Sequence, residues 1–271
     1  MTVEELLVYG KKHIHSTHSK MLLAEFINKS TLELYNILDY DVEQATSQAY
    51  MQAVDAVKSG KPIQYVIGNV NFLGDKFTIN EDVLIPRFET EELVDYTLKY
   101  AYKRFEYPVD IIDLGCGSGV IGLSLEKRLS THSVDLVDIS EPALKVAEKN
   151  RDDLSLHANL INSDMWKNIK KKYDIVISNP PYIKTNEEIQ DIVKNNEPHL
   201  ALYAGEDGLD CYRKIFKDIK SHLKDNFLIA LEIGCTQADD IKQIINSYLE
   251  NIKIEVIKDM SGKKRMIFIT N

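Results

Sequence analysis

The sequence predicts an α/β protein: an open, mainly parallel sheet that follows a small helical domain. Three observations support this prediction. From residue 108 onward, short apolar runs alternate with helical patterns, as in parallel strands joined by helices. The first of these runs ends in a glycine-rich turn. Before residue 60, in contrast, apolar residues recur only at helical spacing, which indicates a separate helical segment.

The first sixty residues carry apolar side chains three and four positions apart, interrupted by polar stretches. They predict a small helical bundle as domain 1–60, which Gly60 and Pro62 close because neither residue continues a helix well. Residues 64–80 are rich in β-branched and aromatic residues, with Leu73-Gly74-Asp75 midway. We therefore expect a β-hairpin within a connector of residues 61–86, ahead of a second domain over 87–271.

The strands expected in the second domain are apolar without alternation, which is typical of strands buried on both faces of a parallel sheet. They are expected at 109–114, 134–137, 173–178, 227–233, 253–257 and 265–270. Helical patterns lie between them at 120–129, 141–150, 208–223 and 237–249. The connector before the last strand is too short for a crossover helix, so this terminal strand should be antiparallel.

Composition excludes several classes of protein. The 271 residues include 33 Lys plus Arg and 42 Asp plus Glu, a net charge of −9, which weakens the approach to nucleic-acid phosphates. No apolar run approaches the about 18 residues of a membrane helix, and the N-terminus lacks the apolar stretch of a signal peptide. Cys116, Cys211 and Cys235 lie far apart, so neither a disulfide framework nor a zinc site is indicated. We expect a soluble cytoplasmic protein without a bound metal.

The glycine-rich turn reads Gly115-Cys116-Gly117-Ser118-Gly119 and follows Asp113-Leu114. Glycines let the backbone approach a ligand at a distance that a Cβ would block, with a helix N-terminus behind them. The dinucleotide fingerprint needs glycine at position 120, which is Val120 here. The turn therefore predicts a cofactor loop other than the dinucleotide type, and a purely structural tight turn is the alternative.

Two further segments follow neighbouring strands. Asp138 ends the second strand, where a carboxylate can accept both hydroxyls of a ribose, and Asp135 is its rival, deeper along the strand and on the opposite face. A further strand, the third along the chain, is expected before Asn162, between the strands at 134–137 and 173–178. After it, an adenine ring could lie against Trp166 or Met165, with Asp164 near its amine. Simple core packing of Trp166 is the alternative.

The fourth strand ends in Asn179-Pro180-Pro181-Tyr182. Two prolines stiffen the chain and remove two N–H donors, which leaves the carbonyls of Asn179 and Pro180 as acceptors. With the Asn179 side chain they could accept both hydrogens of a planar NH₂ group, on which Tyr182 could stack. We predict Asn179, Pro180 and Tyr182 as catalytic residues, and all four residues as the substrate site.

These motifs resemble S-adenosylmethionine-dependent methyltransferases of the class I fold that act on amide or exocyclic amine nitrogens. Further segments are similar to the release factor glutamine methyltransferase family, which methylates the glutamine of the Gly-Gly-Gln motif in class I peptide chain release factors. They are Pro62 to Gly68, Val83 to Glu91, Glu197-Pro198, Leu200 to Leu202, Asp207 to Leu209 and Leu231 to Gly234. The resemblance runs from Pro62 onward; the first sixty residues agree in length and helical character.

The resemblance implies a class I methyltransferase domain, S-adenosyl-L-methionine as cofactor, S-adenosyl-L-homocysteine as product, and a release factor as protein partner. The cofactor residues it implies are Gly115, Cys116, Gly117, Ser118, Gly119, Asp138, Trp166 and Asn179. An exocyclic-amine methyltransferase of DNA or RNA bases is the alternative enzyme, and a non-catalytic binding module is the alternative from another class.

Some positions stay open. Phe88 stands where the family usually has proline. Thr90 could act in the site or cap the next helix, and Arg87 could act there or pair with Glu89 or Glu91. His13, His15 and His18 are spaced i, i+2 and i+5, which does not place them on one helical face as a spacing of i, i+4 would, and this disfavours a metal site there.

Overall fold

The computed structural model describes residues 1–271 and divides them into two compact units. One unit comprises residues 1–69 and 190–196, and the other comprises 70–189 and 197–271. Each has its own apolar core. No helix in either unit combines the length and apolar character needed to cross a membrane.

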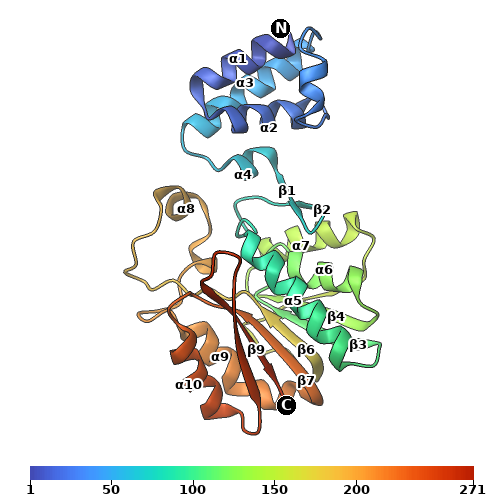
Figure 1. Ribbon diagram of the computed structural model, residues 1–271, viewed down its shortest axis with the longest axis vertical. Coiled ribbons are helices and arrows are strands. Elements are labelled where there is room, and N and C mark those ends of the chain that lie inside the picture. The colour runs from blue at the N-terminus through green and yellow to red at the C-terminus, as the bar shows by residue number, and fades with distance from the viewer. The chain divides into compact units, whose positions relative to one another are not determined.

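The first unit is helical, as predicted (Figure 1). Its core contains Leu6, Leu22 and Val54 from the three longer helices. Gly10 lets two helices approach closely, because an added Cβ would lie 2.0 Å from the Tyr50 hydroxyl. The helices are α1 (Val3–His13), α2 (Ser16–Phe26), η1 (Glu33–Asn36), α3 (Gln44–Lys58), α4 (Ile63–Ile67) and α8 (Asp191–Asn196).

The prediction of one hairpin over residues 64–80 is wrong in its first part. Pro62 precedes the short helix α4, and Gly68 ends it with a left-handed φ of 80°. The β-branched residues of this helix pack on the helical core, which overrides their preference for strands. The hairpin itself is shorter, with β1 (Asn69–Phe72) and β2 (Asp75–Thr78) joined at Leu73-Gly74.

The second unit contains a seven-stranded sheet in the order β5-β4-β3-β6-β7-β9-β8. The first five of these strands run parallel to their neighbours, whereas β9 is antiparallel to both β7 and β8. This confirms the mainly parallel sheet with an antiparallel terminal strand. The strands are β3 (Val109–Leu114), β4 (Thr131–Asp138), β5 (Asn159–Asn162), β6 (Tyr173–Ser178), β7 (Leu223–Glu232), β8 (Lys253–Lys258) and β9 (Lys264–Thr270).

Helices cover both faces of this sheet, and alternate residues of each strand enter different cores. Ile111 of β3 packs in the core beneath α5, α6 and α7, whereas Ile112 packs in the core beneath α9 and α10. Both residues are fully buried, which explains why the strand has no polar alternation. The helices are α5 (Phe88–Arg104), α6 (Val120–Arg128), α7 (Glu141–Asp153), α9 (Asp210–Asp218) with η3 (Ile219–His222), and α10 (Ala238–Tyr248). One further turn, η2 (His199–Ala201), precedes α9.

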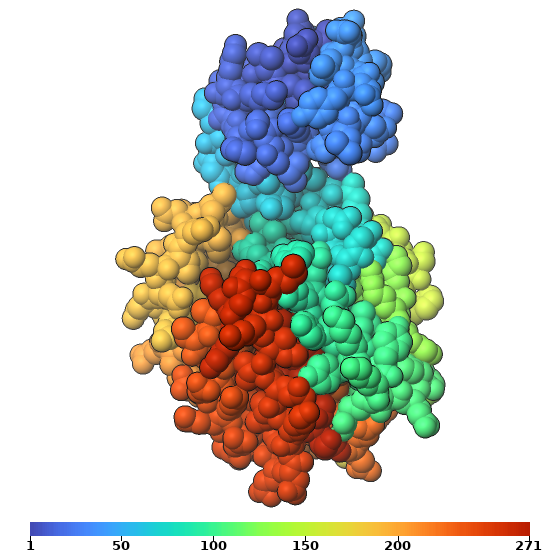
Figure 2. Space-filling view, in the orientation of Figure 1, coloured from blue at the N-terminus to red at the C-terminus, as the bar shows by residue number.

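Segments far apart in the chain meet in this unit. The space-filling view shows the green α5 beside the red C-terminal hairpin (Figure 2). There the Met260 N–H donates to the Glu92 carboxylate, and the Tyr100 ring stacks on Phe268 at 4.7 Å. Helix α5, the first helix of this unit, is therefore attached to β9 and to the turn that precedes it.

Candidate active site

A cavity of 290 Å³ opens at the carboxyl end of the parallel strands in the second unit. Segments that follow β3, β4, β5 and β6 all contribute to it, as expected where parallel strands end at one edge. Residues before α5 and around η2 complete the wall. Its lining includes Val83, Leu84, Pro86, Thr90, Gly115 to Ser118, Asp138 to Ser140, Ser163 to Met165, Asn179, Pro181, Pro198, Leu200, Ala201, Cys211 and Lys214.

The glycine-rich loop supplies one wall of the cavity. Gly115 and Gly117 have φ values of 72° and 53°, and the positions where their Cβ atoms would lie are open space. The loop is held from behind, because the N–H groups of Gly115 and Cys116 both donate to the Val137 carbonyl at 2.8 and 2.9 Å. Gly119, also left-handed, precedes α6 and faces Leu123 instead of the cavity.

Cys116 and Ser118 line the cavity beside the glycines. The Cys116 thiol is buried, and this burial raises its pKa well above the ordinary value. A thiol in such surroundings stays protonated, which agrees with its interpretation as a small apolar filler. The loop thus presents mainly backbone to the cavity.

Asp138 lies at the cavity, at the end of β4. Its two oxygens accept hydrogen bonds from the backbone N–H groups of Ser140 and Gly117, each at 2.9 Å. Burial raises the pKa of Asp138, although these hydrogen bonds oppose the rise. The rival Asp135 does not line the cavity; it accepts hydrogen bonds from Tyr173 at 2.6 Å and Asn159 at 2.7 Å.

Trp166 does not line the cavity. Its indole N–H donates to the Ile215 carbonyl at 2.7 Å, and its ring stacks on His222 at 4.5 Å within the core on the α9 side. The contacts of the ring are those of the core-packing alternative, and the assignment of Trp166 to the cofactor stays a prediction. Met165, with a left-handed φ of 48°, and Asp164 line the cavity from the same segment.

Asn179 reaches the cavity with its amide held on one side. Its Nδ2 donates to the Thr90 hydroxyl at 3.2 Å, and that hydroxyl donates to Glu232 Oε2 at 2.7 Å. Pro181 also lines the cavity, whereas Pro180 is buried and absent from the lining. Tyr182 points toward Glu232, with 3.5 Å between its hydroxyl and Oε1. The structure thus brings together Asn179, Pro181 and the glycine loop, and places Pro180 and Tyr182 behind them.

Arg87 and Thr90 take neither of the simpler roles that the sequence suggests. The Arg87 guanidinium pairs with Glu197 at 2.5 Å, and Glu197 also accepts the Ile85 N–H at 3.2 Å. The helix α5 begins at Phe88, so Thr90 lies inside its first turn and is no cap. Phe88 itself is 60% exposed.

Two acidic residues of this region were not singled out from the sequence. Asp113 is fully buried, with Oδ2 accepting the Gly122 N–H at 2.9 Å and Oδ1 without a partner. Its burial, reinforced by the charge of Asp138, raises the pKa of Asp113 to about 7. Glu232 is 1% exposed at the end of β7, and burial raises its pKa to about 7. In the sequence, the only feature that marks Asp113 or Glu232 is that each is an acid near the end of an apolar run.

Comparison with solved structures identifies the fold. A T. thermophilus 16S rRNA methyltransferase, solved with AdoMet and guanosine, has a TM-score of 0.55 and 14% identity, covering 75% of this chain and 49% of that one. A ribosomal protein methylase from Lactobacillus delbrueckii has a TM-score of 0.51 and 18% identity, covering 70% and 82%. Both likenesses show the class I methyltransferase fold.

Sequence comparison is more specific. Residues 93–202 match the model of the methyltransferase small domain, and residues 13–68 match that of the PrmC N-terminal domain. A release factor glutamine methyltransferase of Streptococcus pneumoniae is 39% identical, covering 84% of this chain and 82% of the relative. One of Clostridium botulinum is 33% identical over 98% of both chains. Both units are thus covered by relatives of one kind, and the chain belongs to the release factor glutamine methyltransferase family.

Proposed function

We propose that this protein transfers a methyl group from S-adenosyl-L-methionine to the side-chain amide nitrogen of the glutamine in the Gly-Gly-Gln motif of class I peptide chain release factors. The observation that carries the proposal is the Asn179 amide beside the glycine loop, with its nitrogen committed to Thr90 and its oxygen left over for a ligand. An amide oxygen in that position accepts a hydrogen from a planar NH₂ group.

The cavity fits the proposed cofactor. The open space in front of Gly115 and Gly117 lets a ligand meet bare backbone, and Asp138 supplies carboxylate oxygens for ribose hydroxyls. We assign Gly115, Cys116, Gly117, Ser118 and Asp138 to cofactor binding, with Met165 rather than Trp166 beside the adenine. The bound cofactor supplies an electrophilic methyl group on a sulfonium.

The protein's own contribution is to hold the glutamine nitrogen in line with that methyl group. A carboxamide nitrogen is a poor nucleophile because its lone pair is delocalised into the carbonyl. In the proposed reaction its two N–H groups donate to Asn179 Oδ1 and to the backbone carbonyl of Pro180, although the Pro180 ring is buried and does not line the cavity. These hydrogen bonds favour pyramidalisation and stabilise the developing positive charge. The Pro180 carbonyl accepts no hydrogen bond from the rest of the chain. After transfer the nitrogen is strongly acidic, and its proton leaves to these acceptors or to water.

A methyl-transfer assay with labelled S-adenosylmethionine tests the function. A class I release factor, duplex DNA and ribosomal RNA are offered separately to the full-length protein. We expect label only in the release factor, and loss of label when its Gly-Gly-Gln glutamine is replaced by alanine. Label in DNA or RNA alone would assign the enzyme to the exocyclic amines of bases instead.

We also propose that the helical unit recognises the release factor, in the cytoplasm where such factors act. A glutamine side chain offers little surface, so selecting one glutamine requires contacts beyond the amide site. The test is a chain beginning at Val70, because Ile63 is buried in the helical core and a cut before it would expose apolar surface. We expect the shortened chain to keep S-adenosylmethionine binding and to lose most methylation of intact release factor. An unchanged kcat/KM would assign the helices to stability alone.

A further inference from the structure

A chain of three polar side chains runs from the core to the cavity. Glu232 is buried at the end of β7, the Thr90 hydroxyl lies 2.7 Å from its Oε2, and Asn179 Nδ2 lies 3.2 Å from that hydroxyl. Thr90 is 2% exposed, so these groups bond to one another rather than to solvent. The chain joins elements that are 142 and 89 residues apart in sequence.

The charge on Glu232 decides the direction of both hydrogen bonds. An ionised carboxylate only accepts, so the single hydroxyl hydrogen of Thr90 must point toward Glu232. The Thr90 oxygen is then available only as an acceptor, which requires the NH₂ side of the Asn179 amide to face it. Because the amide is planar, its oxygen lies on the other side, free to accept from a ligand.

We propose that Glu232 and Thr90 are positioning residues that orient the Asn179 amide, so that its oxygen and not its nitrogen is offered to the substrate NH₂ group. This inference rests on the proposed function, since it specifies how the amide acceptor of that reaction is held. A reversed amide would present a donor to a donor and leave the substrate hydrogens unsatisfied.

The surroundings of Glu232 make the orientation of the Asn179 amide sensitive to pH. The groups that face it are Thr90 and Glu89 of α5, Tyr182 after β6, and Arg265 of β9. Burial raises the pKa of Glu232 to about 7, with Thr90 and Arg265 lowering it and Glu89 raising it further. Below pH 7 the carboxyl gains a proton that it can donate to Thr90, which removes the constraint on the Asn179 amide.

Tyr182 does not compete for this role. Burial, together with the charge of Glu232, raises the pKa of Tyr182 to about 12, so its hydroxyl keeps its proton and can only support the ionised carboxylate. Arg265 is itself directed to Asp259 at 3.3 Å and to the Ile233 carbonyl at 3.3 Å. Neither group, therefore, replaces Thr90 as the link to Asn179.

Two substitutions of similar size separate orientation from packing. Thr90→Val keeps the shape of the side chain but removes the hydroxyl, and Thr90→Ser keeps the hydroxyl but removes a methyl group. We expect kcat on the release factor to fall about 10- to 100-fold in Thr90→Val, the effect of one misaligned polar contact, and to be rescued in Thr90→Ser. S-adenosylmethionine affinity and thermal unfolding of both variants show whether the fold and the cofactor site persist. Equal kcat in two folded variants would overturn the proposal.

The pH profile provides a second readout that a packing role would not change. At saturating substrates, kcat of the wild type should fall as pH decreases through about 7. Glu232→Gln replaces the carboxyl with an amide that does not ionise, so in this variant the fall of kcat below about pH 7 should disappear. If a folded Glu232→Gln protein keeps the fall of kcat, and Asp113→Asn, which removes the other acid with a pKa of about 7, abolishes it, the assignment to Glu232 is wrong.

A spectroscopic measurement needs no methyl transfer and so separates this inference from the proposed function. In protein labelled with ¹⁵N-asparagine, the Asn179 side-chain resonances, assigned by their loss in Asn179→Ala, should shift with a midpoint near pH 7. The shift should be absent in Glu232→Gln. If the Asn179 resonances of the wild type titrate in this way but the protein methylates no release factor, the proposed function is refuted and the orientation of Asn179 by Glu232 and Thr90 is retained. Resonances that do not titrate would refute the device, whatever the activity.

Discussion

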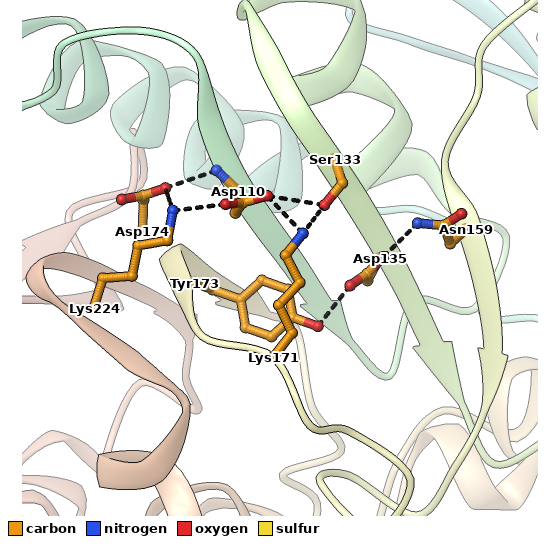
Figure 3. Close-up of polar contacts among 8 residues, drawn as sticks. All are labelled: Asp110, Ser133, Asp135, Asn159, Lys171, Tyr173, Asp174 and Lys224. Carbon is orange, nitrogen blue, oxygen red and sulfur yellow. Dashed lines mark hydrogen bonds and ion pairs between the residues drawn. The ribbon is translucent and has the colours of Figure 1, made fainter.

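Near the start of the parallel strands, Asp110 and Asp174 face lysines; near their carboxyl ends, Asp113, Asp138 and Glu232 instead accept hydrogen bonds from backbone amides or hydroxyl groups. Near the start of the strands, Asp110 accepts from Lys171 at 2.5 Å and from Lys224 at 2.6 Å, and Lys224 also reaches Asp174 at 2.7 Å (Figure 3). Ser133 donates to Asp110 at 3.0 Å. Beside this cluster, Tyr173 and Asn159 both donate to Asp135.

At the other edge, Asp113, Asp138 and Glu232 form no ion pair. Burial raises the pKa of each, whereas the pKa of Asp110 is lowered to about 2 because its hydrogen bonds from Lys171, Lys224 and Ser133 outweigh its burial. The sheet thus carries a self-satisfied polar network at one end and, at the other, three acids that form no ion pair. The difference teaches that the amino half serves stability, and that the carboxyl edge keeps polar groups available to a ligand.

The largest effect should come from Asn179→Ala, which removes the amide at the cavity. We expect methyl transfer to the release factor to fall about 10²- to 10³-fold, since one preorganised polar contact is commonly worth that much. Thermal unfolding should change little because the side chain lies at the cavity and not in a core. Near wild-type turnover would refute the role of Asn179 and weaken the contrast between the two edges.

The next effect is that of Asp138→Ala on cofactor affinity. The loss of a charge-assisted partner should cost about 1.5–3 kcal/mol of S-adenosylmethionine binding, measured by calorimetry. Asp135→Asn is the matched control, because Asp135 bonds to Tyr173 and Asn159 in the amino half. If Asp135→Asn weakened binding and Asp138→Ala did not, the two aspartates would exchange roles.

A smaller effect is expected for Lys224→Met, which breaks part of the amino-half cluster. The free energy of unfolding should fall by about 1–2 kcal/mol, because the pair is only partly exposed to solvent. Methyl transfer should not change. Lys217→Met, on the exposed side of α9, serves as the control that alters charge without breaking an ion pair. Denaturant titrations measure the free energy of unfolding of both variants. If Lys224→Met lost activity without losing stability, the amino half of the sheet would not serve stability alone.

The smallest effect is the pH dependence of that loss. Because the pKa of Asp110 is lowered from 3.8 to about 2, its ion pairs contribute their full stability above pH 3.8, and the contribution disappears as pH falls through about 2. The difference in unfolding free energy between wild type and Lys224→Met should therefore be constant from pH 5 to 7 and shrink below pH 4. Denaturant titrations at these pH values measure it, and a difference that grows on acidification would have the wrong sign.

The predicted strands agree best where burial on both faces produces a continuous apolar run. β3 and β6 begin and end at the residues predicted for them, whereas β4 begins three residues earlier, at Thr131, because its polar start bonds to the amino-half cluster. The hairpin was predicted too long because Pro62 and Gly68 delimit a helix made of residues that usually favour strands.

The site could be predicted in part, since parallel strands bring the segments after them to one edge whatever their side chains do. Gly115, Gly117, Asp138 and Asn179 meet at the cavity for that reason. The direction of a side chain is not contained in such a pattern, so Trp166 was expected at the cavity although its ring turns into the core. The link from Glu232 to Thr90 joins residues 142 positions apart, and no local motif contains it.

The position of β9 has a consequence for the order in which the sheet assembles. β8 is bonded only to β9, and β9 lies between β8 and β7. A strand with one partner cannot join the sheet before that partner is present. The short connection between β8 and β9 makes their pairing local and fast, whereas pairing with β7 closes a longer loop that includes α10. We therefore expect the two strands to add to the sheet as one preformed hairpin, so that folding of this edge proceeds by docking rather than by strand-by-strand growth.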